Sequence, residues 1–356
     1  MIKHNPVSRH VYPNGDVFEG TIIDGQIQGY GKITYSDGSV YEGNFVDSKF
    51  HGRGKLIYAD GTVYEGDWFN NKFCGKGKLH ISNGDFYEGE FANGVFEGIG
   101  KYTWVNDGVY EGNFANGREN GKGKRIFAGG DVYEGDWVNG SLHGNGRMTY
   151  ANGDVYEGGF FDYKRTGYGK YTLTNGNIYE GTFVNDKLNG KGKAISPFGD
   201  IYEGDFFEDK RRGKGRMIYA NGDIYEGDFD NVPHGKGKVV RSNGNIYEGD
   251  WFQGKPHGKG KTTHLIGDTY EGDYVDGMYH GKGIYTSFQG DIYEGDFVNN
   301  TYNGIGKFTF ADGDIHEGEF VNGLPNGKGK HTYKNGKIET GYFKDGEYVG
   351  KFPWSK

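Results

Sequence analysis

The chain has 356 residues, of which 69 are Gly, 17% are aromatic and 34% are hydrophobic, and its formal net charge is −8. An average globular chain is roughly 45–50% apolar, so a single deep aliphatic core is not expected. The acidic balance argues against a general nucleic-acid binder. The many aromatic residues argue against disorder, and the lack of a long apolar run argues against a transmembrane helix. The first ten residues show no secretory signal, and the single cysteine, Cys74, favours a reducing compartment.

A tripeptide, Tyr-Glu-Gly, recurs along the chain with a spacing of 23 residues, and 15 copies or variants of it run from Phe18 to Glu339. One spacing, from Tyr225 to Tyr247, is 22 residues. When the first residue of each tripeptide is numbered 0, Gly occupies positions 2, 11, 13 and 20, and these columns hold 58 of the 69 Gly. Gly at fixed positions of a repeat predicts turns and close packing rather than a flexible linker.

Each copy has a period of two, which predicts β-strands. Tyr (0), Gly (2) and an aromatic residue (4) fall on one face, and Glu (1) and Asp or Asn (3) fall on the other. A turn at positions 6 and 7, such as Asn93-Gly94, precedes a second strand that begins Gly-Lys-Gly-Lys, as at 190–193. A second turn at positions 19 and 20, such as Asn152-Gly153, leads to the next copy. Each repeat is therefore predicted to contain two strands, about thirty in the whole chain.

These patterns predict an all-β fold, an elongated twisted solenoid of stacked antiparallel β-hairpins with one 23-residue hairpin per repeat. We expect an N-terminal cap at 1–14, the repeat array at 15–350 and a C-terminal tail at 351–356. The residue missing from the short repeat falls between Phe229 and Gly235, in a predicted turn where a change of length is tolerated.

One register brings the columns into agreement. If facing positions sum to 15, Tyr (0) faces position 15, Gly (2) faces Gly (13), and the aromatic residue at position 4 faces Gly (11). Glu (1) then faces position 14, which is Lys or Arg in 13 of 14 copies, with Ile284 as the exception. Opposite charges across a strand pair contribute roughly 0.2–1 kcal/mol each, so we expect a repeated charge ladder on this face.

The pattern Gly-x-Gly, six residues, Gly-x-x-Tyr-Glu-Gly-x-Phe/Trp resembles the MORN repeat along nearly the whole chain. The resemblance implies protein assembly or phospholipid binding rather than catalysis. Similar proteins built almost wholly of this repeat are scaffolds of apicomplexan and kinetoplastid cytoskeletal structures. Related repeats occur in ciliary radial-spoke heads, junctophilins and plant phosphatidylinositol-phosphate kinases. The end copies depart from the pattern at Phe18, Ile22, His316, Glu339 and Thr340, which predicts capping units.

From this resemblance we expect a non-enzymatic scaffold or adaptor, without a cofactor, that presents an extended repeat surface for protein–protein assembly. Its expected setting is a cytoskeletal structure in the cytoplasm, either ciliary (axonemal, radial-spoke-like) or part of the membrane skeleton. The expected partners are other proteins of that assembly, and self-association into a homo-oligomer is also open. The alternative is a phosphoinositide- or phospholipid-binding module that tethers a membrane to the cytoskeleton.

The aromatic side of the sheet is the first candidate surface for a protein partner. A single-layer sheet has no second layer to cover this side, and large exposed apolar patches usually mark interaction surfaces. The alternative is that the rings satisfy one another above the Gly columns. The representative residues are Tyr41, Phe45, Tyr64, Trp68, Tyr133, Trp137, Tyr247 and Trp251.

Basic residues in the first turns of three consecutive repeats form a second candidate surface, for an anionic lipid. Juxtaposed Lys and Arg attract anionic lipids with about 1 kcal/mol each, whereas the alternative is an ordinary solvated edge. These residues are Lys164, Arg165, Lys187, Lys210, Arg211 and Arg212.

Metal binding and catalysis are not favoured by the remaining columns. His recurs before Gly (11), as in the row His234, His257 and His280, and Cys74 shares its column with His51. Equivalent positions of neighbouring repeats lie two strands apart, about 9.6 Å, which is too far for two ligands of one zinc ion. The Glu residues at position 1 all have equivalent surroundings, whereas acid–base catalysis needs carboxylates in different environments. We therefore predict no metal and no catalytic site.

Overall fold

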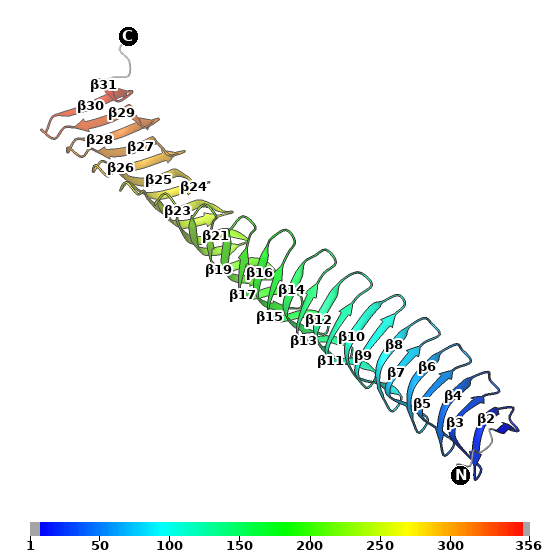
Figure 1. Ribbon diagram of the computed structural model, residues 1–356. Coiled ribbons are helices and arrows are strands. Elements are labelled where there is room, and N and C mark those ends of the chain that lie inside the picture. Colours follow the sequence, from blue (N-terminus) through cyan, green and yellow to red (C-terminus); the bar gives the residue numbers. More distant parts are fainter. Residues whose placement is uncertain (1–7, 352–356) are drawn as a thin grey trace. The chain divides into compact units, whose positions relative to one another are not determined.

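The computed structural model describes residues 8–351, and every regular element among them is a β-strand (Figure 1). The described residues form 31 strands, and they contain no helix able to cross a membrane. The chain divides into two compact units. Unit 1 comprises 1–174 with 183–186, and unit 2 comprises 175–182 with 187–356. The predicted all-β fold is confirmed.

In the described part of unit 1, each strand pairs antiparallel with the next strand of the chain. The strands are β1 (Ser8–Val11), β2 (Val17–Ile23), β3 (Gln26–Thr34), β4 (Val40–Val46), β5 (Lys49–Ile57), β6 (Val63–Phe69), β7 (Lys72–His80), β8 (Phe86–Ala92), β9 (Val95–Trp104), β10 (Gly108–Ala115), β11 (Arg118–Ile126), β12 (Val132–Val138), β13 (Ser141–Thr149), β14 (Val155–Phe161) and β15 (Lys164–Thr172).

The strands of unit 2 follow the same scheme from β17 onward. Strand β16 (Ile178–Val184) contributes residues to both units. The others are β17 (Lys187–Ile195), β18 (Ile201–Phe207), β19 (Lys210–Ile218), β20 (Ile224–Asp230), β21 (Val232–Val240), β22 (Ile246–Phe252), β23 (Lys255–Thr263), β24 (Thr269–Val275), β25 (Met278–Thr286), β26 (Ile292–Val298), β27 (Thr301–Thr309), β28 (Ile315–Val321), β29 (Leu324–Thr332), β30 (Ile338–Lys344) and β31 (Glu347–Gly350).

The first turn of each full-length repeat has two residues, both in the left-handed region. Asn70 and Asn71 have φ of 47° and 64°, and Asn93 and Gly94 have φ of 53° and 89°. Positive φ at both central positions defines a type I′ turn, whose twist matches that of the flanking strands. The short repeat retains only Asn231 between β20 and β21, so the missing residue does fall in this turn.

The predicted register is confirmed for the half of the hairpin nearer the second turn. Tyr41 faces Leu56 and Gly43 faces Gly54, so the facing positions sum to 15. The same sum relates each second strand to the first strand of the next repeat. The hydrophobic and charged columns therefore stay in line across both kinds of strand pair.

The prediction that the aromatic residue at position 4 faces Gly (11) of its own hairpin is wrong. A bulge follows Gly (2), so that Phe45 faces Phe50 instead. Gly (11) has a positive φ, +63° at Gly52, and it faces the position-4 ring of the next repeat, Trp68. The bulge therefore moves a second ring, at position 9, to the aromatic side of the sheet.

The Asp at position 3 stabilises this bulge. Asp67 Oδ2 accepts a hydrogen bond from the backbone N–H of Lys76 at 3.1 Å, and Asp273 does the same for Lys282 at 2.9 Å. A side chain on Gly75 would lie 2.7 Å from Asp67 Oδ2. Gly is required at position 11 both for its φ and for the space beside the Asp.

Neighbouring repeats are also joined at their second turns. The Asp two residues before the tripeptide accepts a backbone N–H from the next second turn, as in Ala151 to Asp131 and Ala220 to Asp200, both at 2.8 Å. These bonds run in the direction of stacking and add to the sheet ladder.

Apart from Tyr179, each Tyr (0) ring lies on a floor of Gly. A Cβ added to Gly43 would come 2.6 Å from the Tyr41 hydroxyl oxygen, and one added to Gly54 would come 2.6 Å from its ring. The Tyr41 hydroxyl donates to the carbonyl oxygen of Asn44 at 2.9 Å, which satisfies the buried polar atom. The Gly columns therefore leave the space that the rings fill.

Other rings cover the Tyr from above and from the sides. Phe50 stacks on Tyr41 with ring centroids 3.7 Å apart, and Phe45 and Trp68 contact its edges at 5.1 and 5.3 Å. Such pairs contribute roughly 0.5–1.5 kcal/mol beyond the burial of their area. The core of each unit is thus a row of interlocking rings.

Residues 8–14 of the predicted cap include β1, which pairs with β2. Residues 1–7 of the cap and 352–356 of the tail lie outside the described residues.

Candidate functional site

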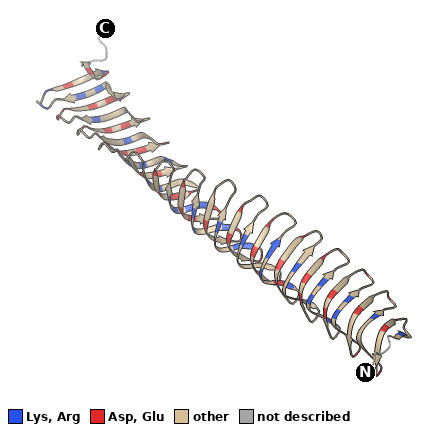
Figure 2. Ribbon diagram, in the orientation of Figure 1, with Lys and Arg blue, Asp and Glu red and all other residues tan. Residues whose placement is uncertain are grey.

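The charged face of unit 2 carries the predicted ladder (Figure 2). Glu (1) faces Lys or Arg (14) of its own hairpin, but the ion pairs of these two columns in the described residues join neighbouring repeats. Lys193 Nζ lies 2.8 Å from Glu203, and Lys261 Nζ lies 3.2 Å from Glu271. Exposed pairs of this kind contribute about 0–1 kcal/mol each, so the ladder helps to set the stacking register.

A second row of ion pairs runs beside the first. Lys (12) of one repeat meets Asp (3) of the next, as in Lys259–Asp273 and Lys282–Asp296, both at 2.6 Å. Lys236 contacts Asp250 in the same way and holds the pKa of that carboxyl below its usual range, although partial burial acts in the opposite direction. In unit 2 most cations of the face are therefore already matched.

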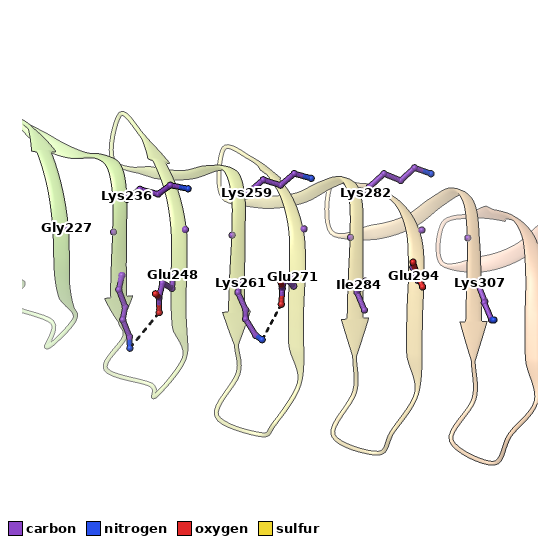
Figure 3. A pocket seen from close by; sticks show the side chains of 18 of the residues that line it. Gly227, Lys236, Glu248, Lys259, Lys261, Glu271, Lys282, Ile284, Glu294 and Lys307 are labelled. Carbon is purple, nitrogen blue, oxygen red and sulfur yellow. Dashed lines mark ion pairs between the residues drawn. The ribbon is translucent and has the colours of Figure 1, made fainter.

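The ladder breaks at two exposed isoleucines. Ile284 replaces Lys at position 14 and is 44% exposed, and Ile305 replaces Lys at position 12 and is 57% exposed. Ile284 faces Glu294, which forms no ion pair with any described residue. Figure 3 shows the ion pairs of Glu248 and Glu271, whereas Glu294 lies beside Ile284.

These residues line a pocket of about 1370 Å³ on the charged face, hereafter the charged-face pocket (Figure 3). Its walls are Lys and Glu side chains of the ladder, and its floor is the backbone of the Gly columns. Charges are paired along most of the length of the pocket. At Ile284 and Ile305 its surface is apolar, and the Glu294 carboxylate beside them is unpaired among the described residues. This arrangement suits binding of an extended partner.

The aromatic residues predicted to form an uncovered face are buried instead. Tyr41, Phe45, Tyr64, Trp68, Tyr133, Trp137, Tyr247 and Trp251 are between 0 and 8% exposed. The bulge brings the side chain of position 9 over the Tyr rings, and the Gly residues beneath allow the rings to pack directly against the backbone of the sheet. They therefore form the core rather than an open contact surface, and this expectation is corrected.

The six basic residues predicted as a lipid contact separate into two groups. Lys164, Lys187, Lys210 and Arg212 are exposed. Arg165 and Arg211 occupy position 9 and turn to the aromatic side, where each guanidinium lies over a ring, Tyr171 at 4.5 Å and Tyr202 at 5.3 Å.

Arg165 also binds Asp186, by an Nε contact of 3.4 Å and an Nη2 bond of 2.6 Å to its carbonyl oxygen. Lys187 pairs with Glu208 at 3.2 Å. Of the six, Lys164 and Arg165 belong to unit 1 and the other four to unit 2.

The His columns pack against rings. His51 lies 5.1 Å from Phe69 and His143 lies 4.7 Å from Phe161. The part of the chain that the structure describes contains no group of three or more His, Cys, Asp or Glu placed to hold a metal ion. Burial raises the pKa of the Cys74 thiol.

A family model with the description "MORN repeat" matches 14 consecutive segments, which together run from 18 to 338. The chain belongs to the MORN-repeat family. As a protein built of MORN repeats, it is a repeat scaffold of a kind that often binds membranes or proteins. The predicted family membership is confirmed.

A search of curated proteins gives no match. Among solved structures, the SAS-4 TCP domain of Drosophila melanogaster, in complex with a proline-rich motif of Ana2, is 15% identical with a TM-score of 0.26, covering 50% of this chain and 85% of that one. The wild-type TCP10 domain of Danio rerio CPAP is 14% identical with a TM-score of 0.25, covering 62% and 94%. A virginiamycin B lyase from Staphylococcus aureus is 12% identical with a TM-score of 0.13, covering 83% and 95%. At such TM-scores these likenesses carry no argument about this MORN-repeat protein.

Two features of the repeat do not follow from its periodicity. The position-9 ring looked like part of a loop, because the bulge was not foreseen. The variable residues at positions 9, 15 and 17 can also lie together: in the Tyr87 repeat Phe96 (9) stacks on Tyr87 at 4.0 Å, and Tyr102 (15) lies 5.7 Å from Phe96 and 4.5 Å from Trp104 (17). In the sequence, only the variation of these positions from repeat to repeat indicated that they belong together.

Proposed function

We propose that this protein is a non-catalytic scaffold of a cytoskeletal structure in the cytoplasm, ciliary or membrane-skeletal, and that it binds a partner protein in the charged-face pocket. The observation that supports the pocket is the break in the ladder at Ile284 and Ile305. Exposed isoleucine side chains in a row of matched charges leave apolar surface in contact with water, which is unfavourable, and they form no ion pair with the neighbouring strands. A partner segment with an apolar side chain for the isoleucines and a cation for Glu294 fits this place.

The test compares the wild-type chain with a variant that restores the repeat pattern, Ile284→Lys with Ile305→Lys. Both lysines fit columns that carry Lys elsewhere, so we expect the variant to fold. In proximity labelling in the native cell, we expect the wild type to label cytoskeletal proteins and the variant to label its direct partner about tenfold less, the loss of one well-buried anchor.

The matched control is Ile99→Lys in unit 1, because Ile99 also occupies position 12 and is 65% exposed. It should label the same partners as the wild type. Labelling without cytoskeletal proteins would contradict the proposed setting, and equal labelling by the double variant would contradict the proposed surface.

The alternative function, a module that tethers anionic phospholipid to the cytoskeleton, is supported by Lys210 and Arg212. Both are exposed near the start of β19, two residues apart, and neither forms an ion pair within the described residues. Co-sedimentation with phosphoinositide vesicles should then fall severalfold in the variant Lys210→Glu with Arg212→Glu. Binding that is unchanged, or equally reduced by Lys334→Glu, would exclude this contact.

A further inference from the structure

Unit 2 also contains a cavity of about 490 Å³ on the aromatic side of the sheet. It lies beside the Tyr247 repeat, which carries smaller residues at positions 9 and 15 than the Tyr41 repeat does. Position 9 is Pro256 where the Tyr41 repeat has Phe50, and position 15 is Thr262 where that repeat has Leu56. The space that a ring and an aliphatic side chain fill elsewhere is therefore open here.

Hydroxyl and imidazole groups replace apolar contacts around this cavity. Tyr274 is at position 4, where the other repeats have Phe or Trp, apart from Ile22 in the first, and its Oη lies 2.6 Å from Thr262 Oγ1. His264 Nε2 lies 2.9 Å from Tyr279 Oη. Each pair uses one hydrogen between its members, so each retains one further hydrogen to donate.

The acceptors of the lining are already occupied. Asp268 accepts from the Tyr285 hydroxyl at 2.5 Å and from the backbone N–H of Phe288 at 2.9 Å. The side-chain oxygens of Asn245 and Asn300 accept backbone N–H groups at 3.1 and 2.7 Å.

The remaining groups are donors. The side-chain nitrogens of Asn245 and Asn300 make no hydrogen bond with any described residue. Arg241, at the exposed rim, forms no ion pair within the described part of the chain. The pKa of Asp223 is lowered chiefly by the backbone hydrogen bond of Ser242 and only in small part by the charge of Arg241.

The lining also holds the Asp268 carboxylate, whose pKa is lowered chiefly by the hydrogen bond from Tyr285 and whose oxygens are occupied. The groups left free are therefore donors and the Arg241 cation, which suit a ligand that accepts hydrogen bonds and carries negative charge on the side away from Asp268.

We propose that this cavity binds a small organic oxyanion, a carboxylate or phosphate on a ring or short chain. The oxyanion would bind Arg241 and the hydrogens left by the His264–Tyr279 and Thr262–Tyr274 pairs, and the body would pack on the half-buried rings of Tyr279 and Tyr285, which also line the cavity. The volume lies within the range of small-molecule sites. The site is separate from the charged-face pocket, because it lies on the opposite side of the sheet.

The test is calorimetric titration of the full chain with phenyl phosphate and with benzoate, with benzyl alcohol as the neutral probe. We expect at least one anion to bind with Kd of about 1 mM or tighter and benzyl alcohol to bind at least about tenfold more weakly. Arg241→Gln should weaken anion binding about tenfold, whereas Lys334→Gln, an exposed cation of another second turn, should leave it unchanged.

A second variant, Thr262→Leu with Tyr274→Phe, restores the residue types of other repeats and should abolish binding by filling the cavity. Anion binding that both variants retain would overturn the proposal, as would equal binding of benzyl alcohol. Failure of both anions to bind at about 20 mM would also overturn it. Binding of phosphoinositide vesicles through Arg241, without binding of either free anion, would assign the site to a lipid headgroup and overturn the small-molecule proposal.

Discussion

The repeats of Tyr64 and Tyr110, both in unit 1, have the same Gly floor beneath the Tyr ring. They differ in the side chains that lie over the ring, hereafter the cover. In each, Gly at positions 2 and 13 lies beneath the ring, and the hydroxyl donates to a backbone carbonyl at 2.9 and 2.8 Å. Over Tyr64, Phe73 stacks at 3.7 Å. Over Tyr110, position 9 is Glu119, so an acidic side chain stands where a ring is expected.

The charge of Glu119 is met by Arg125 at position 15. Their closest atoms lie 3.8 Å apart, and their side chains are only 13% and 10% exposed. Arg125 also binds Asp107 at 2.6 Å and lies over the Trp104 ring at 4.3 Å. The floor is therefore common to both repeats, whereas the cover can change if its residues change together.

Removal of one member of the ion pair is expected to have the largest effect. Arg125→Met leaves Glu119 buried without a partner, which should lower the free energy of opening around β10 and β11 by about 3–5 kcal/mol. Hydrogen exchange of these strands in the full chain measures this quantity. Glu119→Phe with Arg125→Leu, which copies Phe50 and Leu56 of the Tyr41 repeat, should be neutral or stabilising. A double variant as unstable as Arg125→Met would show that the covers cannot be exchanged.

Damage to the common floor should cost nearly as much and should not depend on the cover. A Cβ at Gly77 would lie 2.6 Å from the Tyr64 ring, so Gly77→Ala should destabilise its repeat by about 2–3 kcal/mol. Gly123→Ala beneath Tyr110 should cost the same. The control is Gly129→Ala, because a Cβ there has no neighbour within 4 Å, and its effect should stay within about 0.5 kcal/mol. Unequal costs at Gly77 and Gly123 would contradict a shared floor.

A smaller effect on stability is expected in the repeat where His316 takes the place of Tyr (0) above the Gly floor. His316 is 1% exposed, neither ring nitrogen has a partner among the described residues, and burial lowers its pKa to about 4. His316→Tyr should stabilise unit 2 by about 1 kcal/mol at pH 7, because Tyr can donate to the carbonyl of Glu319 as other repeats do.

The gain from His316→Tyr should grow as the pH falls. An unfolded His has a pKa near 6.5, so between about pH 6.5 and 4 the unfolded wild-type chain binds more protons than the folded one. The free energy of unfolding of the wild type therefore decreases as the pH is lowered through this range. The difference between variant and wild type should increase by up to about 1.4 kcal/mol per pH unit in this window. Urea unfolding at several pH values measures it, with His257→Tyr on the opposite face as the control. A constant difference would contradict the buried neutral His.

The strands and turns could be predicted because they depend on neighbours in the chain. Alternating side chains, Asn-Gly turns and the spacing of 23 residues locate β4 (Val40–Val46) and β5 (Lys49–Ile57) closely. The bulge could not be predicted, because it depends on Asp (3) capping the backbone of position 12 across the hairpin. For the same reason the sequence placed Arg165 and Arg211 at an exposed edge, although the bulge turns them toward rings.

The repeat length, the paired strands, the Gly columns and the family follow from the order of residues, since each is a local or periodic property. Which side of the sheet is accessible depended on the tertiary structure. The Tyr rings are buried because a one-residue bulge brings the position-9 side chain over them, a ring in some repeats and Glu, Leu, Arg or Pro in others. Ile284 and Ile305 are exposed because the ladder leaves them no partner. The small cavity near Thr262 likewise exists only where residues distant in the chain meet. Burial is set by such distant contacts, and periodicity alone does not encode them.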